Sequence, residues 1–257
     1  IEGELRVDRV AVSAYATDAS LHEIEPLAVA FPRQTRDVEI LAAYSSNNNI
    51  PLIARGAGSG LAGGAIGSGI VIDFSRHMNQ IVSISEDRVR VQPGVVREKL
   101  NERLKEQGRY FAPDPSNSRI STVGGMLGVD GAGPHAVRVG SARDHAESIE
   151  CVLSGGQRLE LGREALMRHT TLAESISLNR DSAVILSDSA HPDNLRLSTM
   201  TAMTRRTQLL EQLEDILRDN ESLIRELQPP LLRNGCGYHL RGVLQDNRID
   251  LARMLVG

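Results

Sequence analysis

The stretch RGAGSGLAGG, Arg55 to Gly64, has glycine at five of its ten positions and a single charge at its head. Glycine is favoured where φ is positive or where the backbone must approach a ligand closely, and it costs roughly 0.5–1 kcal/mol when fixed in regular structure. Successive unpaired N–H groups can converge on phosphate oxygens, and a nearby Arg complements their charge. The stretch therefore predicts an anion-binding loop, with a flexible surface loop as the alternative.

Two short apolar runs flank this loop. Residues 50–54 and 70–74 are predicted to be buried strands that the loop joins. Residues 58–63 match the pattern GxGxxG, but residues 64–69 are too few for the helix that a dinucleotide-binding fold requires, and Asp73 comes too early for the ribose contact. No Lys-Ser or Lys-Thr follows the glycines, which argues against a nucleoside-triphosphate loop. What remains is a strand, loop, strand unit that binds pyrophosphate through its backbone.

The composition is that of an ordinary globular protein, with 257 residues of which 40% are hydrophobic and 24% charged. The net charge of -4 argues against nucleic acid as the main partner, and an aromatic content of 3% without Trp disfavours base stacking. No apolar run reaches the roughly 20 residues of a membrane span and no basic signal segment is seen, so we expect no transmembrane segment and a cytoplasmic protein. Cys151 and Cys236 match no metal spacing and are interpreted as small reduced hydrophobic residues.

The rest of the chain shows helical and hairpin patterns. We expect one helix that starts at Thr35 as N-cap, a second from Val96 to Gly108, and an amphipathic helix through Leu209 and Leu217. The other predicted features are hairpins at 81–84 with 88–92 and at 149–153 with 158–161, a loop-rich region at 111–144, a surface insertion near 163–203, and a helix stop at Pro229-Pro230.

Pro51 to Val82 resembles the pyrophosphate loop of the FAD-linked oxidases of the vanillyl-alcohol oxidase type, in the branch of the D-lactate, glycolate and D-2-hydroxyglutarate dehydrogenases. Six further segments resemble this family in the family's order. They are YATDAS (15–20), VQPGVV (91–96), APDPSNS (112–118), STVGGM (121–126), VGSARD (139–144) and NGCGYHL (234–240). Each motif alone is weak, but six in order are specific, and the likeness covers most of the chain outside 163–203.

The resemblance implies an α+β fold, a two-subdomain FAD-binding domain of the vanillyl-alcohol oxidase type. The first subdomain would span residues 1–80 with the pyrophosphate loop, and the second residues 81–257. Carried over residue by residue, the FAD contacts would come from short or small residues whose backbone can approach the cofactor. They are Arg55, Gly56, Ala57, Gly58, Ser59, Gly60 and Leu61 at the pyrophosphate; Pro113, Asp114, Pro115, Ser116, Ser121, Thr122, Gly124 and Gly125 at the flavin and ribityl; and Gly140, Ser141 and Val152 toward the adenine end.

For two of these motifs a purely structural interpretation stays open. The DPS segment can be a plain Asp-Pro turn, and TVGG can be a helix N-terminus packed closely on a strand. The sequence also departs from the family, which often has Tyr at the position of Val139 and Asn at that of Asp130, so contacts near these two are uncertain. No His lies between Arg55 and Gly69, where covalently flavinylated relatives carry one, so we expect non-covalent FAD and no metal site.

The resemblance implies oxidation of a D-2-hydroxy acid by hydride transfer to flavin. Two alternatives are a reductase of a UDP-sugar enolpyruvate and a nucleotide-binding module without catalysis. The first residues and the closing LARMLVG suggest a piece of a longer chain, and the resemblance places the catalytic groups beyond Gly257. This piece is therefore expected to be inactive alone. The polar reach 163–203 resembles the large enzymes fused to iron–sulfur modules, which would take electrons from reduced FAD. The physiological electron acceptor stays unknown.

Overall fold

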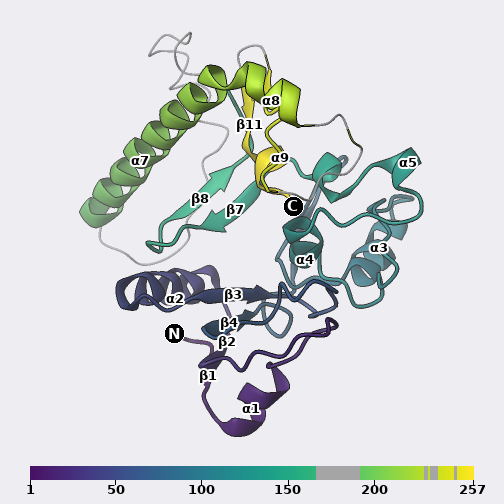
Figure 1. Cartoon of the computed structure of the whole chain (residues 1–257), viewed down its shortest axis with the longest axis vertical. Coiled ribbons are helices and arrows are strands. Elements are labelled where there is room, and N and C mark those ends of the chain that lie inside the picture. The colour runs from purple at the N-terminus through teal and green to yellow at the C-terminus, as the bar shows by residue number, and fades with distance from the viewer. Residues whose placement is uncertain (166–191, 229–230, 232–236, 246–247) are drawn as a thin grey trace.

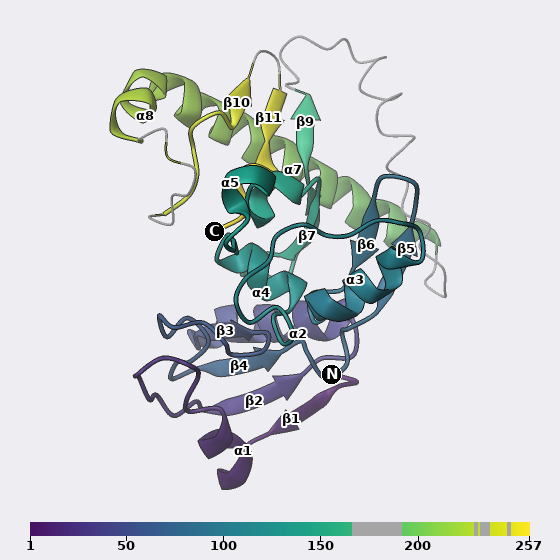
Figure 2. The same cartoon turned by 90° about the vertical axis from the view of Figure 1, so that its right-hand side faces the viewer.

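The computed structural model of the chain describes residues 1–165, 192–228, 231, 237–245 and 248–257. Figures 1 and 2 show a four-stranded sheet with α1 (Arg9–Ala14) and α2 (Thr35–Asn48) toward one end, and α7 (Pro192–Asp219) and α8 (Glu221–Leu227) toward the other. Between them lie α4 (Val123–Gly128) and a hairpin of β7 (Ile149–Val152) and β8 (Arg158–Leu161). Segments that are distant in sequence therefore meet in the middle of the molecule (Figures 1 and 2).

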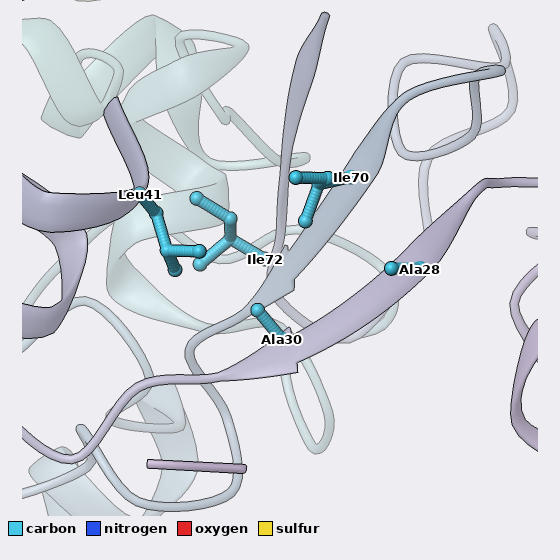
Figure 3. Close-up of a cluster of buried hydrophobic side chains, with 5 residues drawn as sticks. All are labelled: Ala28, Ala30, Leu41, Ile70 and Ile72. Atoms are coloured by element: carbon cyan, nitrogen blue, oxygen red, sulfur yellow. The ribbon is translucent and has the colours of Figure 1, made fainter. Parts of the chain in front are cut away.

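The first sheet has the order β1-β2-β4-β3. β1 (Glu4–Arg6) pairs antiparallel with β2 (Ala28–Phe31), while β2, β4 (Ile70–Asp73) and β3 (Leu52–Arg55) run parallel. All residues of β2 and β4 are buried, as is typical of parallel strands covered on both faces. Leu41 of α2 packs on Ala28, Ala30, Ile70 and Ile72 (Figure 3). Both strands predicted beside the glycine loop are present; β4 is buried as predicted, whereas β3 is only half-buried.

The start of α2 differs from the prediction. Gln34, not Thr35, is the N-cap, and its side chain makes no capping hydrogen bond. Thr35 instead donates from Oγ1 to Oε1 of Glu150 on β7 over 3.2 Å. The N-terminal strand is held nearby by Asp37, whose buried carboxylate accepts the backbone N–H groups of Glu2, Gly3 and Arg33. A long-range contact therefore replaces the local cap.

A second core forms around α3 (Arg97–Lys105), where Val95, Leu100, Leu104 and Val123 are buried together. It lies beside the predicted hairpin of β5 (Ile81–Ile84) and β6 (Val89–Val91). The helix ends before Gly108, which has a φ of 69°. The region predicted to be mainly loops, 111–144, also contains α4, α5 (Ala136–Val139) and the 3₁₀ helix η1 (Ala142–His145). These helices are too short to show a sequence period.

A third core contains Leu217, Val243, Ile249 and Leu251. It joins α7 to α9 (Leu251–Leu255) and to a three-stranded sheet of β10 (Leu244–Gln245), β11 (Arg248–Asp250) and β9 (Arg163–Ala165). The ends of the predicted insertion are therefore regular structure, because 163–165 pair with β11 and α7 starts at Pro192; residues 166–191 lie outside the described residues.

The amphipathic helix is interrupted earlier than predicted. α7 ends at Asp219, and Asn220 separates it from α8. Asn220 donates from Nδ2 to the carbonyl of Ile216 over 2.8 Å, which satisfies a group that helical continuation would use. Pro229 and Pro230, predicted to end the helix, lie outside the described residues.

Candidate functional site

The glycine loop leaves β3 with its N–H groups unbonded. Within the described part of the chain, no backbone N–H of residues 56–64 donates a hydrogen bond. Three carbonyls of the loop do accept bonds: Gly58 from the N–H of Ala19, Ser59 from Asn117, and Ala65 from Arg55. The loop thus turns carbonyl groups toward protein donors and leaves N–H groups available for an anion.

Two glycines of this loop have different reasons to be glycine. Gly58 has a φ of 63°, and a Cβ there would lie 2.6 Å from the Arg55 guanidinium. Gly60 has no heavy atom within 4 Å of a Cβ built on it. Protein packing therefore explains Gly58, whereas at Gly60 the chain itself leaves open space that a close ligand can use.

The segment 15–20 holds the loop from outside. Arg55 donates from Nη1 to the carbonyls of Thr17 over 2.9 Å and Ala65 over 3.2 Å, and its guanidinium lies 4.9 Å from the centre of the Tyr15 ring. Asp18 accepts the N–H of Ala65 over 3.3 Å. Burial opposes ionisation of Asp18, but hydrogen bonds from Ser20 and Ala65 hold the pKa of this carboxyl below its ordinary value. The sequence motif YATDAS is therefore part of the site's framework.

The segment predicted to border the flavin is fixed by its neighbours. Pro113 is fully buried, and its carbonyl accepts a hydrogen bond from Nε of Arg97 over 2.5 Å. The Asp114 carboxylate pairs with the His135 ring, and this hydrogen bond lowers the pKa of Asp114. Side chains from two other segments, Arg97 and His135, thus hold Pro113 and Asp114 at the start of the DPS segment.

Asn117 connects this segment to the glycine loop. Its Nδ2 donates to the carbonyl of Ser59 over 3.3 Å, and its Oδ1 accepts from the Ser121 hydroxyl over 2.8 Å. Asn117 was absent from the predicted site residues, although it lies in the quoted motif APDPSNS. The motif APDPSNS pointed to this segment, but only the tertiary contact shows that Asn117 is the residue that bonds the glycine loop.

The N-terminus of α4 lies against the glycine loop, because a Cβ on Gly56 would overlap the side chain of Thr122. Thr122 is the N-cap and accepts the N–H of Gly125 over 3.2 Å, while Gly124 donates its N–H to the carbonyl of Pro93 over 2.9 Å. These two N–H groups are already bonded within the protein. The close helix packing considered for TVGG is therefore present, and Gly124 and Gly125 can border a flavin only by their small size.

Gly140 and Ser141 form the start of η1. Gly140 has a φ of 77°, and Ser141 and Asp144 make a capping box in which the N–H of Ser141 donates to Oδ2 of Asp144 over 2.9 Å. Val152 lies on β7, half-buried. No hydrogen bond between described residues joins these three predicted adenine-end positions to the glycine loop. Their proximity to the cofactor stays a prediction.

Asp130, one of the departures from the family, has a structural partner. Its carboxylate lies 3.0 Å from Nη1 of Arg143, and both side chains are buried, 1% and 3% exposed. Arg143 also donates from Nε to the carbonyl of Val256 over 3.0 Å. Nη1 lies 3.3 Å from Nδ1 of His239, and burial, followed by the charge of Arg143, lowers the pKa of this imidazole. The acidic residue at this position therefore serves an internal ion pair.

The histidines show no metal-binding arrangement in the described ranges, where no three His, Cys, Asp or Glu side chains gather as metal ligands. His191 and Cys236 lie outside those ranges, and Cys151 is a half-buried free thiol. His22 comes closest to the glycine loop, since a Cβ on Gly63 would lie 3.1 Å from its Cδ2. Nor does any helix of the described chain have the length and apolar character needed to cross a membrane.

The sequence of this chain matches a known protein family. The model of the family described as "FAD binding domain" matches residues 26–162, more than half of the chain. The chain belongs to the FAD-binding domain family. Its fold is the α+β FAD-binding domain of the vanillyl-alcohol oxidase type that the motifs predicted. Among solved structures of this fold, an alkyldihydroxyacetonephosphate synthase is 26% identical with a TM-score of 0.55, over 61% of this chain and 33% of that one.

Several curated proteins are similar in sequence, among them a dehydrogenase and an oxidase subunit. A D-2-hydroxyglutarate dehydrogenase of Pantoea ananatis is 34% identical over 97% of this chain and 22% of its own length. The glycolate oxidase subunit GlcD of Bacillus subtilis is 33% identical over 58% of this chain and 32% of its own length. The chain therefore spans about a fifth to a third of these relatives.

The residues present fit FAD. A pyrophosphate needs backbone donors that it can approach closely, and the FAD-binding domain has unbonded N–H groups in its glycine loop, with open space at Gly60. The lining from Asn117, Ser121 and Thr122 is neutral, so it adds no repulsion toward the two phosphate charges. The sequence-predicted pyrophosphate loop and flavin segment are thus brought together by the fold.

Proposed function

We propose that this chain is the FAD-binding part of an oxidoreductase that oxidises a D-2-hydroxy acid. The observation that carries the proposal is the likeness to the Pantoea ananatis D-2-hydroxyglutarate dehydrogenase, which extends over 97% of the chain. The match to the FAD-binding family ends at residue 162. The likeness therefore includes the third core, which a shared cofactor alone does not explain, and 2-hydroxyglutarate is the first acid to test.

In this proposal the backbone N–H groups of residues 56–61 bind the pyrophosphate of FAD. Pro113, Asp114, Pro115, Ser116, Ser121 and Thr122 border the flavin and ribityl, with Gly124 and Gly125 leaving room, and Gly140, Ser141 and Val152 lie toward the adenine. When bound, FAD supplies the hydride acceptor for the substrate Cα–H. The protein's part is to position the cofactor: backbone donors would hold the pyrophosphate in the middle of FAD, while the Asp114 segment orients the flavin.

The finer points of the proposal are that FAD is held without a covalent bond, that the protein is cytoplasmic, and that the parent protein can carry iron–sulfur modules as electron acceptors. Non-covalent binding is supported by the absence of His from residues 55–69. A reductase of a UDP-sugar enolpyruvate is the less favoured reaction, because the motifs APDPSNS and NGCGYHL resemble the hydroxy-acid branch.

The test uses the complete protein that contains this chain. Purified under air, it should be yellow, and anaerobic D-2-hydroxyglutarate, D-lactate or glycolate should bleach the flavin absorbance. L-2-hydroxyglutarate and NADPH are the controls and should leave it unchanged. Bleaching by NADPH alone supports the reductase, and a colourless protein that binds no added FAD supports a module of another kind; either result overturns the proposal.

A further inference from the structure

Arg55 is the single charged side chain within residues 55–64, and its guanidinium bonds backbone carbonyls and lies over the Tyr15 ring. Its Nη1 bonds two carbonyls, that of Thr17 in the preceding segment 15–20 and that of Ala65 directly after the loop. Ala65 is ten residues further along the chain, so the second bond closes the loop on itself. One side chain therefore ties the loop's start, its end and the preceding segment 15–20.

The guanidinium is also fixed from its face. It lies 4.9 Å from the centre of the Tyr15 ring, and Tyr15 donates from its hydroxyl to Oδ2 of Asp73 over 2.5 Å. Asp73 ends β4 directly opposite Arg55 in the parallel register, and its other oxygen accepts the N–H and hydroxyl of Ser75. Burial and the Asp73 hydrogen bond raise the pKa of Tyr15, so it stays a neutral donor. Arg55 is thus packed on a ring that the end of the next strand holds.

The loop itself is shaped around this guanidinium. Gly58 has a left-handed φ, and a Cβ at this position would meet Nη2, Cζ and Nε of Arg55 at 2.6, 2.8 and 2.9 Å. The carbonyl of Gly58 accepts the N–H of Ala19 over 3.0 Å. The guanidinium therefore occupies the space beside Gly58. Ala19 of the segment 15–20 donates to the Gly58 carbonyl, and the N–H groups of the loop remain available for a ligand.

We propose that Arg55 is a positioning residue, which sets the shape of the glycine loop together with Tyr15 and Asp73 and acts on FAD binding through the loop's backbone rather than as a direct charge partner of the pyrophosphate. The inference rests on the proposed function for its ligand. It differs from the expectation that Arg55 complements the phosphate charge. If the loop without the Arg55 contacts adopts the binding conformation about a tenth of the time, the apparent Kd for FAD rises about tenfold.

The decisive comparison is Arg55→Lys with Arg55→Gln. Lys keeps the charge but cannot bond two carbonyls in a fixed plane while stacking on Tyr15. A positioning role predicts that both variants weaken FAD binding by about tenfold. It also predicts that the dependence of log Kd on salt concentration stays as in the wild type, because no phosphate-bound charge has been removed. Tyr15→Phe, which loses only the bond to Asp73, should change Kd in the same direction by less.

A second readout needs no FAD. Leu61 is 81% exposed, and thermolysin cleaves before Leu, so cleavage between Gly60 and Leu61 reports how often the loop opens. Both Arg55 variants and, less strongly, Tyr15→Phe should be cut faster than the wild type. The matched control is Arg76, which also stacks on an aromatic ring, 4.8 Å from the centre of Phe31, and pairs with Glu4. Arg76→Lys and Arg76→Gln should match the wild type in both assays.

The two assays separate the possible failures. Wild-type affinity in Arg55→Lys, or a flatter salt dependence in Arg55→Gln, makes Arg55 a direct charge partner and overturns the inference. If thermolysin cleaves Arg55→Gln at the wild-type rate, Arg55 does not hold the loop closed, and the inference is overturned whatever the affinity for FAD. If the wild type binds no FAD, the proposed function fails and with it the role in binding. Circular dichroism of each variant shows whether it is folded. If the Arg55 variants are unfolded, the FAD affinity and thermolysin cleavage of Tyr15→Phe test the inference instead.

Discussion

Asn117 donates a hydrogen bond from Nδ2 to the carbonyl of Ser59 over 3.3 Å, and so joins the glycine loop of the first sheet to the segment that precedes α4. The two residues are 58 positions apart in sequence. Asn117 is itself oriented by the Ser121 hydroxyl, which donates to its Oδ1. The carbonyl of Ser59 is therefore turned toward Asn117, and this bond links the glycine loop to the segment predicted to border the flavin.

Asn117→Ala should weaken FAD binding without unfolding the protein. Loss of one hydrogen bond that fixes the loop is worth about 1 kcal/mol, or about fivefold in Kd. Isothermal titration with FAD measures it. Asn79→Ala is the control, because the exposed Asn79 amide bonds nearby residues: it donates to the carbonyls of residues 75 and 76 and accepts from Gln80. Unaltered affinity in Asn117→Ala contradicts the bridging role.

Gly60→Ala and Gly64→Ala form a matched pair, since an added Cβ at either position meets no heavy atom within 4 Å. Neither change should lower the Tm. Gly60→Ala should raise the Kd for FAD by tenfold or more, about 1.4 kcal/mol, because its methyl group occupies the space for the phosphate. Gly64→Ala lies outside the predicted pyrophosphate contacts and should bind nearly as the wild type. Equal affinity in both variants argues against the pyrophosphate assignment.

Gly58→Ala should behave differently from Gly60→Ala. Its φ of 63° and the neighbouring Arg55 make an added methyl group costly before any ligand binds. We expect a loss of about 1–2 kcal/mol in the free energy of unfolding together with weaker FAD binding. Urea denaturation of the FAD-free protein measures the first effect. A variant as stable as the wild type would show that the loop readily relaxes.

Asp130→Asn should be strongly destabilising, because it leaves the Arg143 charge buried without its acid. Removal of one partner of a buried pair costs about 3–5 kcal/mol. Asn keeps the side-chain shape and tolerates the φ of 46° at this position, so the change tests the charge. Glu106→Gln is the control: its partner Arg103 is exposed, and the expected change is below about 0.5 kcal/mol. Similar unfolding free energies for the two variants would contradict the importance of burial.

Asp37→Asn should destabilise the protein in a pH-dependent way. Burial opposes ionisation of Asp37, but the N–H groups of Arg33, Glu2 and Gly3 outweigh it and hold its pKa below the ordinary value. A lowered folded-state pKa gives stability that is complete above the unfolded value of about 3.9 and is lost as the pH falls through the folded value. The difference between wild type and Asp37→Asn should thus be about 1–3 kcal/mol at pH 7 and shrink below about pH 4. A difference independent of pH would contradict the role of the charge.

Flavin should leave the denatured polypeptide in acid. Residues 55–69 contain no His, but the structure brings His22 beside Gly63. After trichloroacetic acid precipitation, all flavin fluorescence should be in the supernatant. Flavin that stays in the pellet for the wild type but not for His22→Ala would establish a covalent bond at His22 and overturn non-covalent binding.

The sequence by itself determined the parts of this protein that depend on neighbouring residues. Apolar runs predicted β3 and β4, and alternation and turn residues predicted the two hairpins. The short segment 64–69 and the lack of Lys-Ser or Lys-Thr after the glycines argued against the helix-based phosphate loops. The order of the motifs was sufficient to predict the family, because each motif reflects a local backbone requirement that can be seen in the sequence alone.

The tertiary structure alone decided how these parts act together. Whether Arg55 faces a ligand or Thr17, whether Asn117 reaches Ser59, and whether the N–H of Gly124 is free or bonded to Pro93 all depend on contacts between distant segments. A hydrogen bond of this kind imposes no period on the sequence, and the same residue types are compatible with either partner. Only when the chain has folded do burial and geometry select one, and here they select carbonyls for Arg55 and leave the amides of the glycine loop available.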